Sequence, residues 1–210
     1  MIYEIDLLDD EQLQYINSFY EQSNFTGGEI SNPSAAKNNY MMVNYAQSCV
    51  SRVFDQILKY NKDLYSVFLA SKVSQIYPLW YKENCFYDYH IDTTPIGGVN
   101  GHLSMTCFLN DPDEYEGGEL VIKIGSEEVS IKKKKGTAVL YNTGLWHKVN
   151  PVLSGDRKVI VCWIDTAVKD SFIRNHLIEY GNMINSIDVD HGILEKLEHF
   201  RINLIRQYGE

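Results

Sequence analysis

A histidine and an aspartate stand two positions apart in the segment Tyr89-His90-Ile91-Asp92, which precedes a Thr-Thr-Pro turn. If this segment is a β-strand, His90 and Asp92 point to the same face, because successive side chains alternate between the two faces of a strand. Two interpretations are then open: an ion pair at the surface, or two ligands of a metal ion. The three letters His-Ile-Asp on their own favour the surface ion pair.

Another histidine could complete a metal site. His147 lies in the segment Tyr-Asn-Thr-Gly-Leu-Trp-His, after a predicted strand at residues 136–142. Two imidazoles and one carboxylate bind one face of a metal ion and leave positions open for substrate and oxygen, which suits non-haem Fe(II). Strands far apart in sequence are neighbours in a jelly roll, so Asp92 and His147 can meet there. Surface or packing roles are expected for the other four histidines, His102, His176, His191 and His199.

Arg157 begins a predicted strand in which Arg157, Val159, Val161 and Trp163 share one face. If that face is the core, the guanidinium is buried and needs an anionic partner, because an unpaired buried charge costs several kcal/mol. Its planar fork suits a carboxylate, and no acidic residue lies nearby on that face. The partner would then be the carboxylate of a ligand. An exposed arginine beside the Gly155-Asp156 turn is an equally open interpretation.

The composition limits the class of protein. The 210 residues, 44% hydrophobic and 12% aromatic, are enough for one sizeable domain with its own core. The net charge of −9 argues against a nucleic-acid or anionic-membrane partner. The cysteines form no CxxC pair, which favours free thiols in a reducing compartment. With neither a signal peptide nor an apolar run of membrane-spanning length in the sequence, we expect a cytoplasmic protein.

Hydrophobic spacing divides the chain into helical ends and a β-rich centre. Helices are expected at residues 9–22, with Asp9 and Gln12 as a capping box, at 45–59 and at 62–70. A C-terminal helix follows a turn near residues 181–190, and one of its faces carries Ile193, Leu197, Phe200 and Leu204. From about residue 73 the period becomes two. The strand candidates begin near Val73 and continue at 103–109, 120–124, 136–142 and 157–164.

Short strands at this spacing predict a β-barrel or a double-sheet jelly roll. We therefore expect an α+β fold with a mainly β core, in which helices pack around a jelly roll. One domain would cover residues 1–210: mainly helical support at 1–72, the jelly-roll core at 73–165 and C-terminal helices at 166–210. The run Lys132–Lys135 is interpreted as a solvated hairpin strand, because the chain as a whole is acidic.

Together these residues resemble a known family: the Fe(II)- and 2-oxoglutarate-dependent oxygenases of the prolyl 4-hydroxylase superfamily, and within it the PKHD-type hydroxylases. The matching stretches are YKENCFYDYHID (81–92), LSMTCFLNDPDEYEGGELVI (103–122), GTAVLYNTGLWHKVNPV (136–152) and SGDRKVIVCWID (154–165). FTGGEI (25–30), AAKNN (35–39) and the C-terminal helices also look like that family.

The resemblance implies roles for the matching positions. His90, Asp92 and His147 would bind Fe(II), and Arg157 would bind the distal carboxylate of 2-oxoglutarate. Tyr81 falls where the family places a tyrosine that helps bind the same carboxylate; packing is its alternative role. Gly117-Gly118 would form a tight turn before a strand. Two segments depart from the family, Lys82-Glu83-Asn84 and the loop 93–102. Both would border the mouth of the site, so they leave the substrate open.

The activity implied is hydroxylation of a C–H bond by O2, coupled to conversion of 2-oxoglutarate to succinate and CO2, with ascorbate to keep the iron reduced. A prolyl or other amino-acid residue in a peptide or protein is the expected target. A free amino acid or small metabolite is the alternative, as is a non-oxidative, cupin-like metal protein that ignores 2-oxoglutarate. The sequence leaves a monomer and a homodimer equally open.

Overall fold

The computed structural model describes residues 1–28 and 36–209. Parts of the family-like stretches 25–30 and 35–39 lie outside the described residues. The helices are α1 (Asp10–Gln22), α2 (Asn44–Tyr60), α3 (Lys62–Ser66), α4 (Ser171–Ser186) and α5 (His191–Tyr208). No helix in the described part of the chain is long and apolar enough to cross a membrane.

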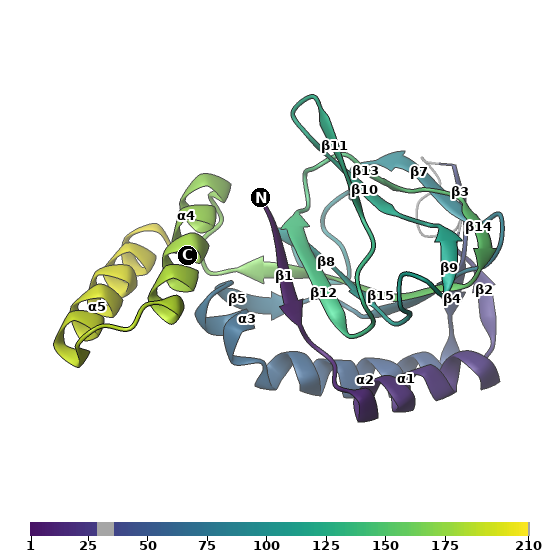
Figure 1. The fold of residues 1–210 in the computed structure, drawn as a ribbon, viewed down its shortest axis with the longest axis horizontal. Helices are drawn as coiled ribbons and strands as arrows, with labels where there is room; N and C mark the ends of the chain where they lie inside the picture. The colour runs from purple at the N-terminus through teal and green to yellow at the C-terminus, as the bar shows by residue number, and fades with distance from the viewer. Residues whose placement is uncertain (29–35, 210) are drawn as a thin grey trace.

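Most of the strands belong to two antiparallel sheets that face each other (Figure 1). The major sheet has the order β1 (Ile2–Asp6), β12 (Thr137–Asn142), β8 (Leu103–Phe108), β15 (Arg157–Thr166), β6 (Tyr77–Tyr81), β4 (Tyr40–Met42) and β2 (Phe25–Gly27), and β5 (Ala70–Val73) also pairs with β15. The minor sheet has the order β11 (Glu127–Ile131), β10 (Leu120–Ile124), β13 (His147–Val149), β7 (Phe86–His90) and β3 (Lys37–Asn38). A separate pair joins β14 (Val152–Gly155) to β9 (Tyr115–Gly117). This architecture is the predicted jelly roll.

The major sheet is buried on both faces, which explains why its strands carry two different side-chain patterns. In β8, Met105 and Cys107 pack toward the helices, whereas Phe108 belongs to the core between the two sheets. Helices α1 and α2 lie along the outer face of this sheet (Figure 1). The Tyr20 hydroxyl of α1 donates to the carbonyl oxygen of Val159 at 2.9 Å, which fixes the helix to the central strand. The inner face is thereby left to form a site.

The N-terminal helices follow the sequence prediction closely. The capping box is present, because the Gln12 N–H donates to Asp9 Oδ1 at 2.8 Å and the Asp9 N–H donates to Gln12 Oε1 at 3.1 Å. Helix α2 covers the predicted 45–59. The predicted helix at 62–70 is wrong beyond Ser66, because Ala70–Val73 instead pair with β15.

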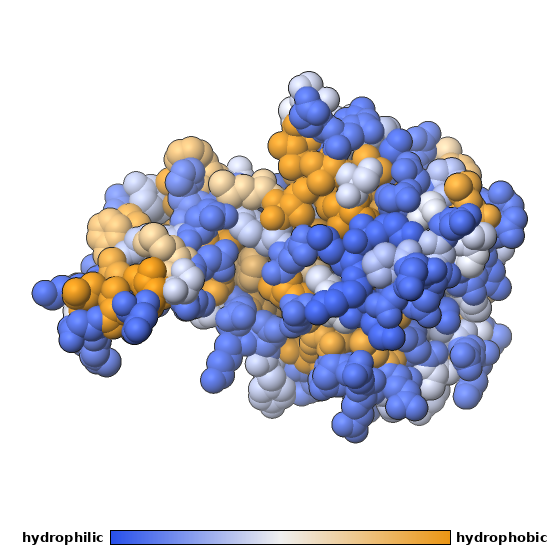
Figure 2. Space-filling view, in the orientation of Figure 1, coloured by the Kyte–Doolittle hydropathy of each residue, from blue (hydrophilic) through white to orange (hydrophobic). Residues whose placement is uncertain are grey.

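The C-terminal region differs from the prediction in two ways. The expected turn near 181–190 is shorter, since α4 continues to Ser186. The apolar face of α5 is not buried on the β-core: Ile193 is 50% and Phe200 56% exposed, and α5 packs against α4 at the end of the molecule away from the barrel (Figures 1 and 2). Arg201 anchors α5 by donating to the carbonyl oxygens of Ser66 and Val67, at the end of α3.

The basic run Lys132–Lys135 follows β11 and lies outside the strand. Lys133 Nζ lies 2.6 Å from Glu4 Oε1 and Lys135 Nζ lies 2.9 Å from Asp111 Oδ2. These lysines pair with acidic groups of the same chain, so the prediction of a solvated hairpin strand is corrected to a connection held by ion pairs.

Candidate metal centre

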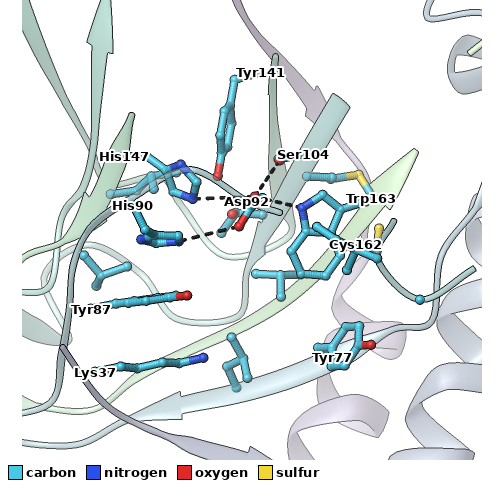
Figure 3. A pocket seen from close by; sticks show the side chains of 18 of the residues that line it. Lys37, Tyr77, Tyr87, His90, Asp92, Ser104, Tyr141, His147, Cys162 and Trp163 are labelled. Carbon is cyan, nitrogen blue, oxygen red and sulfur yellow. Dashed lines mark hydrogen bonds and ion pairs between the residues drawn. The ribbon is translucent and has the colours of Figure 1, made fainter. Parts of the chain in front are cut away.

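A cavity of about 310 Å³ opens between the two sheets. His90, Asp92, His147, Tyr81 and Arg157 all line it, so the fold brings all five predicted site residues to one pocket. Figure 3 shows the two imidazoles and the carboxylate turned toward one another at one side of this space.

The two histidines face each other across one strand pair. His90 ends β7, His147 begins β13, and the two are direct partners in the antiparallel ladder. Asp92 lies two residues beyond the end of β7, so the argument that His90 and Asp92 share a face of one strand is corrected. The chain turns after His90, and the carboxylate still reaches the same place: Oδ1 is 3.5 Å from His90 Nε2 and Oδ2 is 3.7 Å from His147 Nε2. The three ligand atoms lie within 4.8 Å of one another.

Backbone carbonyls orient both imidazoles. His90 Nδ1 lies 2.8 Å from the carbonyl oxygen of Asp88, and His147 Nδ1 lies 2.9 Å from that of Leu145. A carbonyl oxygen only accepts, so each Nδ1 carries the proton and each Nε2 keeps its lone pair. Both lone pairs are therefore available at the point where the carboxylate is also directed.

The charges of the site suit a cation. Burial by itself raises the pKa of Asp92, but the adjacent His90, the nearby His147 and the hydrogen bond from Trp163 outweigh burial and hold the pKa below its usual value. Burial lowers the pKa of His147, an effect that Asp92 opposes and His90 reinforces. An ionised carboxylate and a neutral imidazole are the forms that bind a metal.

Aromatic rings enclose the histidines. The Tyr87 ring stacks on His90 with centroids 3.6 Å apart and planes 15° from parallel, and Tyr141 meets His147 edge-on at 5.3 Å. Figure 3 shows Tyr87 and Tyr141 on opposite sides of the imidazole pair. Burial raises the pKa of Tyr141 well above its usual value, and the nearby Asp92 raises it further. Tyr141 therefore stays a neutral phenol beside the centre.

Arg157 is buried in the same cavity without a partner for part of its guanidinium. Only 1% of the residue is exposed, and its Nε and Nη1 have no hydrogen-bond partner among the described residues. It stands opposite Tyr81 in the ladder between β15 and β6, with the guanidinium carbon 4.8 Å from the Tyr81 ring centroid. Burial raises the pKa of Tyr81, although Arg157 lowers it in part. A buried guanidinium with two unpaired nitrogens, next to a neutral phenol, matches an incoming carboxylate.

Gly118 makes room for this arginine. It has φ +65°, and a Cβ there would lie 3.2 Å from Arg157 Cδ and 3.0 Å from a methyl of Val152. Gly117, with φ +68°, would meet the carbonyl oxygen of Pro151 at 2.1 Å. Gly117 ends β9, and residues 118–119 connect β9 to β10, so the two glycines with positive φ lie at the junction before the strand. Nothing in the sequence pattern indicated that Gly118 also lies beside Arg157.

Comparison with known proteins places the chain in a family. A family model of the 2OG-Fe(II) oxygenase superfamily matches residues 75–165. A PKHD-type hydroxylase of Pseudomonas putida is 32% identical over 219 residues, which cover 97% of this chain and 96% of the relative. The chain belongs to the PKHD-type hydroxylase family. A PKHD-type hydroxylase of Alteromonas mediterranea is 36% identical over 141 residues, but there the match spans only 62% of each protein.

Solved structures share the fold of this PKHD-type protein at low identity. A prolyl hydroxylase of Trichoplax adhaerens, in complex with a hypoxia inducible factor peptide fragment, has a TM-score of 0.58 at 15% identity and covers 79% of this chain and 83% of its own. HygX of Streptomyces hygroscopicus, with nickel, 2-oxoglutarate and hygromycin B bound, has a TM-score of 0.59 at 12% identity and covers 79% of this chain and 82% of its own.

Of the two segments that depart from the family pattern, one borders the cavity. Thr93 and Pro95–Gly97, from the loop after Asp92, line the pocket, as expected. Lys82-Glu83-Asn84 are not among the residues that line it, so that part of the expectation is wrong. Sequence reasoning also missed Tyr87, Ser104 and Trp163, which line the pocket around the histidines and Asp92. The one available signal was the polar side chain of Ser104, which with Thr106 interrupts the apolar residues of β8.

Proposed function

We propose that this PKHD-type protein is an Fe(II)- and 2-oxoglutarate-dependent dioxygenase that hydroxylates a C–H bond and releases succinate and CO2. His90, Asp92 and His147 hold the iron, and Arg157 with Tyr81 binds the distal carboxylate of 2-oxoglutarate. The observation that carries the proposal is the buried, partly unpaired guanidinium of Arg157 in the same cavity as a two-histidine, one-carboxylate set.

The residues of the site fit these two groups. Both Nε2 atoms and the Asp92 carboxylate offer the neutral-nitrogen and anionic-oxygen donors of a facial triad. Bound iron and 2-oxoglutarate would supply the oxidising power, as decarboxylation to succinate is coupled to transfer of an oxygen atom from O2 into the C–H bond. The protein binds and orients these groups. The triad would hold the metal, Arg157 would hold the distal carboxylate of 2-oxoglutarate, and the two sheets would exclude water from the site.

A prolyl or other amino-acid residue in a peptide or protein is the substrate we propose. Support comes from the Trichoplax neighbour, a prolyl hydroxylase that holds a peptide fragment. A free amino acid or a small metabolite is the second candidate, favoured by HygX, the neighbour that holds hygromycin B. A non-oxidative metal protein is not favoured, because the chain matches the 2OG-Fe(II) oxygenase superfamily over the segment that carries the triad.

The proposal extends to the organisation and the location of the chain. Residues 1–210 act as one oxygenase domain around a jelly-roll core at 73–165, supported by the pairing of β1 with β12 and of β4 with β6, which ties the N-terminal part into the major sheet. A cytoplasmic location is supported by the four cysteines, all of which are free thiols.

Succinate release tests the reaction. The purified protein is incubated in air with Fe(II), ascorbate and 2-oxoglutarate, with peptide and metabolite pools added in turn, and products are searched for a gain of one oxygen by mass. We expect succinate, stimulated by the true substrate, and no succinate above background from Asp92→Ala. A wild-type protein that matches Asp92→Ala with every pool would contradict the proposal.

A further inference from the structure

The two oxygens of the Asp92 carboxylate have different surroundings. Oδ2 accepts a hydrogen bond from Trp163 Nε1 at 2.8 Å and a second from Ser104 Oγ at 3.0 Å (Figure 3). Oδ1 accepts neither of these bonds and lies 3.5 Å from His90 Nε2. A carboxylate oxygen has two lone-pair directions, so two donors saturate Oδ2 and leave Oδ1 for another partner.

Both donors are themselves held in place. The backbone N–H of Trp163 donates to Ser74 Oγ at 2.9 Å, and the backbone carbonyl oxygen of Trp163 accepts from the backbone N–H of Ser74 at 2.8 Å. The Trp163 indole packs edge-on against Tyr77, with centroids 5.6 Å apart. Ser104 Oγ also lies 3.0 Å from Thr143 Oγ1. A hydroxyl has one proton and the Asp92 carboxylate only accepts, so Thr143 donates to Ser104 and Ser104 donates to Asp92.

We propose that Trp163 and Ser104 are positioning residues that restrict Asp92 to binding the metal through Oδ1 alone. The inference rests on the proposed function. Three single-atom protein ligands would leave open positions on a bound metal for the cosubstrate and for oxygen. A carboxylate that binds through both oxygens would fill one of these. The indole and the hydroxyl prevent this by occupying Oδ2, so the pocket keeps the coordination number that the reaction needs.

The chain offers a matched control for the indole. Trp80 is also a half-buried tryptophan, packed against Phe25 with centroids 5.1 Å apart, and its Nε1 has no hydrogen-bond partner among the described residues. Trp80→Phe therefore removes an indole N–H that contacts no metal ligand, whereas Trp163→Phe removes one that does. Ser104→Ala tests the second donor with a smaller change, should Trp163→Phe fail to fold.

Metal binding without turnover is the readout. Anaerobic protein is titrated with Co(II) alone, and the visible Co(II) absorption reports both affinity and coordination number. For Trp163→Phe and for Ser104→Ala we expect an altered Co(II) spectrum and a dissociation constant roughly 10- to 100-fold higher, the usual effect of losing a partner of a metal ligand. Trp80→Phe should match wild type in both.

Two results would overturn the inference and separate it from the proposed function. Wild-type spectra and affinities in both Trp163→Phe and Ser104→Ala, even with lowered melting temperatures, would make these residues structural only and leave the iron site standing. Failure of the wild-type protein to bind Co(II) would overturn the metal site itself, and the positioning role with it.

Discussion

Replacing Arg157 with methionine separates the arginine's role in folding from its role in binding. The side chain is 1% exposed, and its Nε and Nη1 have no partner in the described protein. Hydrogen bonds to charged groups contribute about 1.5–3 kcal/mol each. Two such bonds to a cosubstrate carboxylate are thus worth about 3–6 kcal/mol, which predicts a roughly 10²- to 10⁴-fold rise in the dissociation constant of 2-oxoglutarate for Arg157→Met.

Ligand-induced thermal stabilisation measures this loss. With Mn(II) in place of Fe(II) to prevent turnover, 2-oxoglutarate at 100 times the wild-type dissociation constant stabilises the protein by about 2.7 kcal/mol. For a chain of this size that is a rise of about 5–11 °C in melting temperature. A variant with 100-fold weaker affinity gains only about 0.4 kcal/mol from the same concentration, which is about 1–2 °C.

The stability of the ligand-free protein provides the second arm of the experiment. Replacing a buried charged group with an apolar side chain of similar volume is often neutral or stabilising. Because two nitrogens of Arg157 lack partners, the melting temperature of Arg157→Met should be unchanged or higher. Arg201→Met is the matched control, because this arginine is also buried but donates to the carbonyl oxygens of Leu177 and Val67. It should lower the ligand-free melting temperature and keep the full response to 2-oxoglutarate.

Either of two results would refute this reasoning. One is an Arg157→Met protein whose melting temperature rises with 2-oxoglutarate as much as that of wild type, which would show that Arg157 does not bind 2-oxoglutarate. The other is a ligand-free Arg157→Met protein destabilised as much as Arg201→Met, which would mean that the guanidinium has a structural partner.

Further predictions concern the metal centre and the glycine turn. Asp92→Ala and His147→Ala should abolish 2-oxoglutarate turnover while circular dichroism and melting stay close to wild type; full activity in either variant would contradict the triad. Metal affinity should fall in acid, because an imidazole must lose its proton to bind a metal. Burial lowers the pKa of His147, so this ligand should become protonated at a lower pH than an ordinary histidine, and calorimetric titration of Mn(II) between neutral and acidic pH tests the sign. Gly118→Ala should weaken 2-oxoglutarate binding as well as stability, because the added Cβ lies 3.2 Å from Arg157 Cδ and the residue has φ +65°; an unchanged dissociation constant would show that the arginine tolerates the shift.

Those parts of the fold that local patterns determine could be predicted from the sequence. The capping box at Asp9 and the long alternation of residues 103–108 each leave a signal within a few positions. Strand β13 has three residues and α3 has five, too few for a period to show, and each is fixed by its tertiary neighbours. Helix α5 was predicted, but the exposure of its apolar face was not. The spacing of hydrophobic residues indicates that one face of a helix is apolar, but it does not indicate which part of the protein covers that face.

For the site, the sequence indicated residue types better than positions. Alternation along β15 offered the inward direction of Arg157 as one of two open interpretations, and the structure shows that it is buried. The same argument was applied to Asp92, which is placed instead by the turn that follows His90. Trp163 and Ser104 hydrogen-bond to Asp92 from other strands, 71 and 12 residues away in sequence, so no pattern within one strand could connect them.

The pairing of β1 with β12 has a consequence for synthesis of the chain on the ribosome. Ile2 lies opposite Tyr141 in that ladder, and Asp6 lies opposite Thr137. At about 5–20 residues per second, translation takes roughly 7 to 30 s to reach the partner of the first strand. During that interval Tyr3, buried in the finished protein, has no strand to pair with. The major sheet is therefore completed late in translation, and β1 stays without its partner strand until β12 has been made.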